Sequence, residues 1–239
     1  MHRTAPRLAR ILACGAVPVM LVATGCSDDS GSKKKDSSSS SSASAPASAS
    51  ASPTVAPAAF SKLPEACKEI STKTVEKLVP NVKEKNGKVL KPPRNDSSTS
   101  CMWYGTDDDD VKNMQYRYLA IELNLFPSHP TLGSGDQRAK AYVPQESDKA
   151  AKADGAKNVK TGTADGVGDQ AVTVKAESKK DGVDYRDQRV VARTANAVVA
   201  VQYNGAGFQG AKSPDADDLL KQAVAAAKEA LASVAAANK

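Results

Sequence analysis

The segment from Gly205 to Gly210 has spacing used in cofactor binding. Gly-x-Gly-x-x-Gly is typical of a dinucleotide-binding loop, in which a helix begins among the glycines so that its amides face the pyrophosphate. Here the next helix is expected only from Ser213 onward. We therefore interpret the glycines as a connection between a strand and a helix, and we expect no nucleotide cofactor.

The residues for a hydrolase are incomplete. Lys160-Thr161-Gly162 is one element of the penicillin-recognising enzymes, but their Ser-x-x-Lys nucleophile occurs only in a Ser-rich stretch before residue 36. A Ser-His-Asp triad would have to use His129, which lies in an expected loop. Paired acids such as Glu122 and Asp187 would suit an envelope hydrolase if the fold brought them together. We expect the protein not to be an enzyme.

Asp107 to Asp110 are four consecutive carboxylates, and clustered oxygens are the ligands that calcium prefers. The run lacks the alternate-residue spacing, the central glycine and the final glutamate of an EF-hand loop. A charged hairpin tip that keeps a sheet edge soluble explains the run better. No metal site is therefore expected.

Aromatic residues gather on two expected strands, although only 4% of the chain is aromatic. Such clustering is typical of a binding face, and Tyr104, Tyr116 and Tyr118 are the candidates for one. Trp103 lies two residues from Cys101 and is expected to pack in the core.

The first 25 residues have the layout of a secretory signal peptide, with Arg3, Arg7 and Arg10 before an apolar run from Ile11 to Ala23. The run is too short to span a bilayer. Residues 22–26, Val-Ala-Thr-Gly-Cys, resemble the bacterial lipobox, which implies cleavage before Cys26 and attachment of diacylglycerol to its thiol. Acyl chains buried together hold a protein at a membrane. We expect a lipid anchor on the extracytoplasmic face of the cell membrane.

Residues 27–59 are almost entirely Ser, Ala and Pro with a few charges. This composition has too little apolar surface to fold, so we predict that residues 26–59 are the lipidated cysteine and a disordered tether. Loss of the signal peptide removes three of the 33 basic residues against 27 acids, so the net charge falls from +6 to +3. This charge is too small for a nucleic-acid-binding protein. Residues 60–239 are expected to form a single globular domain.

Cys67 and Cys101 are the cysteines that remain once Cys14 leaves with the signal peptide and Cys26 is lipidated. In an oxidising compartment such an isolated pair is expected to form a disulfide. A redox or metal site would be the alternative, but the sequence has no Cys-x-x-Cys motif.

The remaining pattern alternates between helices and strands. Pro64 and Ser71 mark the starts of two short helices, and Ser213 caps a long Ala-rich helix at the end. A polar helix over residues 135–153 should be interrupted at Pro144. Strands are expected around 101–104 and over 116–126, 170–177, 184–193 and 197–203. This order predicts an α+β fold, with an antiparallel sheet of about five strands and the N-terminal and C-terminal helices packed on one face.

Several of these features together resemble a family of small secreted actinobacterial lipoproteins of unknown function. They are the lipobox, the low-complexity tether, the helical Cys67, the element Cys101-Met102-Trp103, the turn Gly166–Ala171 and the Ala-rich last helix. The resemblance covers most of residues 60–239. It implies a cleft between sheet and helices, as in sensor or cargo-binding domains, and it supplies no catalytic residues.

The function expected is therefore that of a non-catalytic ligand-binding or sensing domain held at the membrane, with a small ligand or an envelope protein as partner. An accessory protein that docks to an envelope enzyme or transporter is the alternative, and an envelope hydrolase is the third. A cleft or an aromatic-rich face favours the first, a flat surface the second, and two converging carboxylates the third.

Overall fold

A computed structural model describes residues 55–90 and 97–239. The predicted signal peptide, the predicted lipidation site Cys26 and most of the predicted tether lie outside the described residues. Within the two described ranges, no helix is long and apolar enough to cross a membrane.

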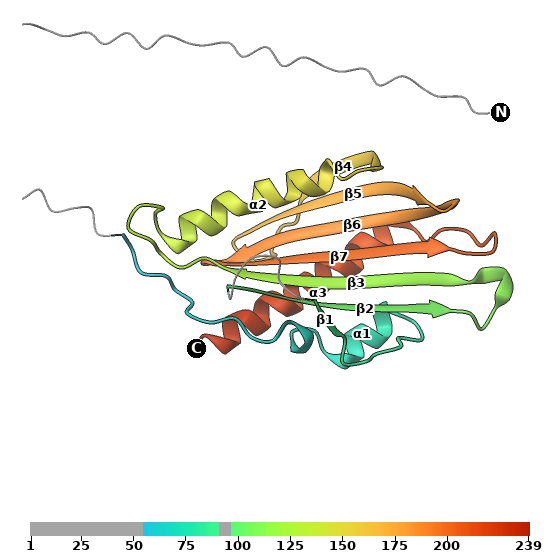
Figure 1. Cartoon of the computed structure of the whole chain (residues 1–239), viewed down its shortest axis with the longest axis horizontal. Helices are drawn as coiled ribbons and strands as arrows, with labels where there is room; N and C mark the ends of the chain where they lie inside the picture. The colour runs from blue at the N-terminus through green and yellow to red at the C-terminus, as the bar shows by residue number, and fades with distance from the viewer. Residues whose placement is uncertain (1–54, 91–96) are drawn as a thin grey trace, which may run out of the picture. The chain divides into compact units, whose positions relative to one another are not determined.

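One antiparallel sheet of seven strands forms the centre of the fold, in the order β1-β2-β3-β7-β6-β5-β4 (Figure 1). The strands are β1 (Lys88–Leu90), β2 (Ser98–Asp107), β3 (Gln115–Leu125), β4 (Lys157–Thr163), β5 (Gln170–Lys180), β6 (Val183–Thr194) and β7 (Ala197–Gly207). The predicted α+β class and the five inner strands are confirmed. The count of about five was low because both edge strands lack an apolar face: β1 has three residues, and β4 is exposed along its whole length.

Three α-helices and two short 3₁₀ helices accompany the sheet. They are η1 (Ala66–Lys68), α1 (Thr72–Leu78), η2 (Val111–Asn113), α2 (Gly135–Ala151) and α3 (Ala216–Ala237). The helix predicted from Pro64 is only the 3₁₀ turn η1, whereas Ser71 caps α1 as predicted, because its side chain accepts a hydrogen bond from Thr74 N.

Two predicted helix features are wrong. α2 runs without interruption through Pro144. Pro144 is exposed, so water can bond to the backbone carbonyl one turn earlier, which lacks an amide donor from the proline. Ala139 and Val143 of the same helix stay packed on the sheet. Asp215 rather than Ser213 caps α3, since its carboxylate accepts hydrogen bonds from Asp217 N and Asp218 N.

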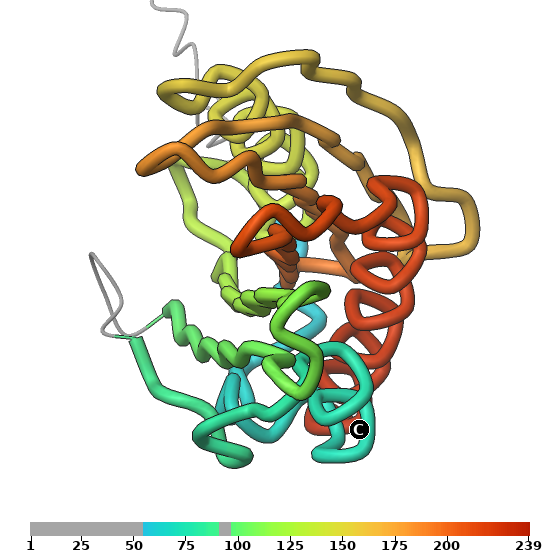
Figure 2. Tube along the Cα trace, turned by 90° about the vertical axis from the view of Figure 1, so that its right-hand side faces the viewer, coloured from blue at the N-terminus to red at the C-terminus, as the bar shows by residue number. Residues whose placement is uncertain are grey.

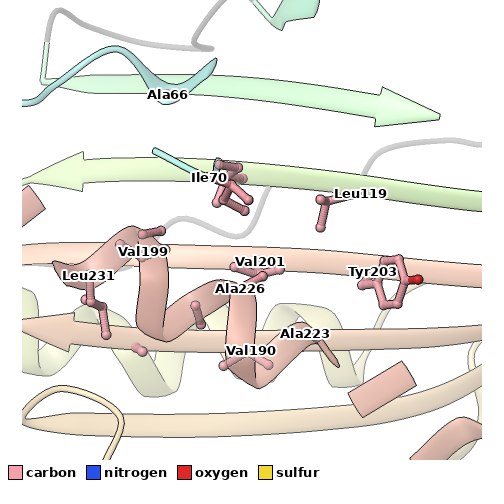
Figure 3. Close-up of a cluster of buried hydrophobic side chains, with 14 of the residues drawn as sticks. Ala66, Ile70, Leu119, Val190, Val199, Val201, Tyr203, Ala223, Ala226 and Leu231 are labelled. Atoms are coloured by element: carbon pink, nitrogen blue, oxygen red, sulfur yellow. The ribbon is translucent and has the colours of Figure 1, made fainter. Parts of the chain in front are cut away.

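The sheet carries helices on both faces, as Figure 2 shows in a view along the strands. η1, α1 and α3 pack together on one face, so the predicted placement of the N-terminal and C-terminal helices is confirmed. The larger core lies there, between α3 and the central strands (Figure 3). α2 packs on the opposite face through a smaller cluster of Ala139, Val143, Val191, Val198 and Ala200.

Cys67 and Cys101 form a disulfide that joins η1 to β2. Trp103, two residues further along β2, points into the same core and is 1% exposed. Its Nε1 donates a hydrogen bond to Lys85 O at 3.2 Å. Trp103 is therefore a core residue, as predicted, and its strand neighbour Tyr104 lies on the other face.

Gln188 is buried on the α3 face, with 1% of its surface exposed. Neither its Oε1 nor its Nε2 has a hydrogen-bond partner among the described residues. Because burying an unpaired amide is costly, we expect Gln188→Leu to raise the free energy of unfolding by about 1–3 kcal/mol. Chemical denaturation measures this change. Gln202→Leu, on the α2 face of the adjacent strand, is the control and should bring no such gain.

Candidate functional site

The α2 face of the sheet changes character along the strands. Where α2 begins, its apolar residues cover Val191 and Ala200. Side chains of a strand alternate between the two faces, so Gln202 and Asn204 of β7 lie on the same face as Ala200. In the register with β6, Gln202 pairs with Arg189 and Asn204 pairs with Asp187. The second half of α2 therefore lies over a polar floor.

A groove runs between this floor and α2. Its larger part is a cavity of 390 Å³. A second cavity of 200 Å³ continues across the sheet toward β1 and includes Leu90, Ser100 and Tyr118. Arg189 and Gln202 line both cavities, so the two parts meet at these side chains.

Two buried polar atoms of the groove lack a partner within residues 55–90 and 97–239. They are Asn204 Oδ1, an acceptor, and Arg189 Nε, a donor. Buried polar atoms in proteins are normally hydrogen-bonded to protein or water. A hydroxyl both donates and accepts, so it can pair with either kind of atom.

Arg189 also organises the charges of the groove. Its Nη2 lies 2.8 Å from Glu146 Oε1 on α2 and 3.8 Å from Glu122 Oε2 on β3. The guanidinium thereby ties the roof of the groove to its floor, and two carboxylates compensate its charge. Because the Arg189 side chain is only 18% exposed, these ion pairs are stronger than surface pairs.

Asp187 lies at the distal end of the floor and accepts a hydrogen bond from Ser178 Oγ at 2.6 Å. Burial raises the pKa of its carboxyl above the ordinary value, and the Ser178 hydrogen bond opposes this rise. The groove therefore contains a carboxyl that favours its neutral form more than a surface aspartate does.

This pKa shift predicts a pH-dependent stability. A carboxyl with a raised pKa in the folded state stabilises the fold below its unfolded pKa, and this contribution is lost as the pH rises through the folded pKa. We expect Asp187→Asn to melt above the wild type at pH 7, with the difference shrinking at pH 3.5. Thermal melts at both pH values test this. Asp165→Asn, at an exposed position, should show no such trend.

The three candidate tyrosines all lie on the α2 face. Tyr104 and Tyr118 are directly paired across β2 and β3, and Tyr116 is two residues from Tyr118. Tyr118 lines the second cavity, whereas Tyr104 and Tyr116 do not line either part of the groove. Tyr116 instead contacts Tyr185 and stacks on Phe208, with ring centroids 6.3 and 5.6 Å apart. The tyrosines thus continue the groove toward the far end of the sheet as an aromatic strip.

The other chemical motifs do not assemble into sites. Glu122 and Asp187 are two strands and four residues apart in the register, so their Cα atoms are about 16 Å apart, while the carboxyl groups of glycosidases are about 5–9.5 Å apart. Gly205 and Gly207 belong to β7, and α3 begins nine residues after Gly207. No group of metal-binding side chains is found among the described residues, those around Asp107 and His129 included.

The central groove residues Arg189, Gln202, Asn204 and Glu146 were not predicted from the sequence. A signal was present in β7, where Gln202 and Asn204 alternate with the apolar residues Val201 and Tyr203 in an otherwise apolar strand. Polar residues at alternate positions of a central strand indicate a face that is not fully covered. Glu146 could not be found in this way, because the sequence does not indicate which side of α2 meets the sheet.

No protein-family model matches the chain, and no curated protein is significantly similar to it. Two similar solved structures come from Mycobacterium tuberculosis. The extracellular domain of PknH is 19% identical over 58% of this chain and 64% of that chain, with a TM-score of 0.33. LpqN, which is involved in cell envelope biogenesis, is 16% identical over 60% of this chain and 82% of that chain, with a TM-score of 0.31. The chain thus spans less than two thirds of the PknH domain.

Proposed function

We propose that this protein is a non-catalytic binding domain, held on the extracytoplasmic face of the membrane by lipid on Cys26, whose groove under α2 binds a hydroxyl-bearing ligand. The observation that carries the proposal is the pair of unpartnered buried atoms, Asn204 Oδ1 and Arg189 Nε. A ligand hydroxyl can donate to an acceptor such as Asn204 Oδ1 and can accept from a donor such as Arg189 Nε. Gln202 and Asp187 supply further polar groups nearby, and Tyr118 supplies an aromatic wall.

The shape of the groove also supports a small ligand. The larger cavity is within the size range of small-molecule sites, which is about 300–1,000 Å³, and it has a few polar groups on a partly apolar lining that includes Val174, Ala176 and Ala150. The positive charge of Arg189 is compensated by the carboxylates of Glu146 and Glu122. A neutral ligand therefore fits better than an anion, which would have to compete with both carboxylates.

Ligand-observed NMR on the full-length chain tests the binding proposal, with a panel of neutral polyols and sugars against carboxylates and amines. We expect only neutral hydroxyl compounds to bind. Asn204→Ala should weaken binding about tenfold, and so should Arg189→Lys, which keeps a positive charge opposite Glu146 but removes Nε. Asn113→Ala, at the far end of the sheet, is the control. A panel without binders, or binding that neither variant weakens, would contradict the proposal.

The anchor is tested separately. We expect the chain expressed in an actinobacterial host to remain with the membrane fraction and to gain the mass of a diacylglyceryl group. Cys26→Ala should release it into the medium, because no acyl chain then holds it. A Cys26→Ala chain that still fractionates with membranes would show that another feature attaches it.

A second candidate function, docking to an envelope protein, has one observation in its favour. Five of the ten aromatic residues of the chain lie in the aromatic strip: Tyr104, Tyr116, Tyr118, Tyr185 and Phe208. Tyrosine and phenylalanine are enriched in protein interfaces. Docking predicts that Tyr116→Ala abolishes association with a partner protein while ligand binding in the groove is unchanged.

A further inference from the structure

An N-terminal strap, residues 55–62, reaches the domain at the end of the sheet where α2 begins (Figure 1). The side-chain amide of Asn196, in the turn between β6 and β7, holds the strap. Asn196 Oδ1 accepts a hydrogen bond from Phe60 N at 2.7 Å, and Asn196 Nδ2 donates to Phe60 O at 3.0 Å. Asn196 is fully buried, and its two bonds with Phe60 are partly buried.

The same amide also holds the segment that leads into α2. Asn196 Nδ2 donates to Phe126 O at 3.0 Å, and Phe126 N donates to Asn196 O at 2.9 Å. A second connection runs in parallel, since Ser128 Oγ donates to Ala56 O at 2.7 Å and accepts from Gly135 N, the first residue of α2, at 2.9 Å. The strap and the start of α2 therefore share their hydrogen-bond partners.

From Phe126 the contacts continue along α2 into the groove. The rings of Phe126 and Tyr142 lie 5.1 Å apart. Tyr142 OH donates to Glu146 Oε2 at 3.3 Å, and Glu146 Oε1 lies 2.8 Å from Arg189 Nη2. Each step is a direct contact, so an unbroken series joins the strap to the guanidinium at the centre of the groove.

We infer that the strap and the groove are coupled through α2, so that a ligand that bonds to Arg189 Nε and shifts the guanidinium against Glu146 loosens the hold of Asn196 on Phe60. This inference rests on the proposed function, because it assigns a regulation to the same groove. Coupling of this kind is reciprocal. If ligand binding changes the equilibrium between the held and the released strap by some factor, release of the strap changes the ligand affinity of the groove by the same factor. The domain would then report occupancy of its groove at the point where its predicted tether ends.

Hydrogen exchange of the Phe60 amide in the full-length chain tests the coupling without any ligand. Glu146→Ala removes the ion pair with Arg189, and Tyr142→Phe removes only the hydroxyl contact, so the second variant remains informative if the first does not fold. We expect each to speed exchange at Phe60 by about fivefold or more, beyond what its change in global unfolding free energy explains. Lys140→Ala, at an exposed position of α2, is the control.

The reverse direction uses Ser128→Ala, which should speed exchange in the second half of α2, around Glu146, and not only in its first turn. Unchanged exchange at Phe60 in both Glu146→Ala and Tyr142→Phe would overturn the inference, and so would an equal effect of Lys140→Ala. Because these measurements use no ligand, their failure is distinguishable from an empty ligand panel, which would count against the groove as a binding site.

Discussion

The double variant Cys67→Ala/Cys101→Ala is expected to lose about 4 kcal/mol of unfolding free energy, because the disulfide closes a loop over a sequence separation of 34 residues. The crosslink restricts the unfolded chain, and it attaches η1, which has only three residues, to the central sheet. For a domain of this size the loss corresponds to a drop in Tm of about 8–16 °C.

Thermal melting of the wild type with and without reductant also measures the contribution of the disulfide to stability. Reduction should lower the Tm by a similar amount and should leave the melt of the double variant unchanged. A double variant that melts with the oxidised wild type would show that the contacts of η1 hold without the crosslink.

Trp103→Ala is expected to destabilise the domain by about 3–5 kcal/mol, since it removes the largest fully buried side chain of the core and leaves a cavity between β2 and the N-terminal segment. Trp103→Phe should cost less, about 1–2 kcal/mol beyond any change in packing, because it keeps a ring but leaves Lys85 O without its hydrogen bond.

Circular dichroism during chemical denaturation is the suitable measurement, because Trp103 is the only tryptophan of the chain and its fluorescence is lost in both variants. The neighbouring Tyr104→Ala is the control, since Tyr104 lies half-exposed on the opposite face. If Tyr104→Ala were as costly as Trp103→Ala, the two faces of β2 would contribute equally to stability.

The parts of the fold that could be predicted are those where burial leaves a regular pattern. The strand around Leu119 and Ile121 alternates clearly because only one of its faces enters the main core. Asp181 and Gly182 form the two-residue turn between β5 and β6, and both adopt the positive φ that such a turn requires. Asp-Gly is a typical sequence for this turn, so the residue types alone indicate it. β4 was missed for the opposite reason: every one of its residues is exposed, so it has no buried apolar face to leave a pattern in the sequence.

The site was less predictable than the fold. Tyr104, Tyr116 and Tyr118 were chosen as candidates because aromatic residues cluster on two expected strands, but the sequence did not indicate which face they share. The register of β2 and β3 places all three on the α2 face. The groove itself depends on where α2 crosses the sheet, which is decided by the contacts of Ala139 and Val143 with residues more than 40 positions away. The ion pair between Arg189 and Glu146 depends on that crossing, and no local sequence pattern around either residue predicts it.

The disulfide also determines how the domain would carry tension applied through its N-terminal end. A pull on the strap would break in turn the hydrogen bonds of Ala56 with Ser128, of Phe60 with Asn196, and of Ser61 and Lys62 with Asn238. It would then reach Cys67, where the load passes through the sulfur atoms into β2. The chain between the two cysteines, including α1 and β1, would carry no force. Extension would stop after the release of residues 55–66, which span at most about 40 Å when fully extended, so the domain could lengthen its attachment under load without opening its sheet.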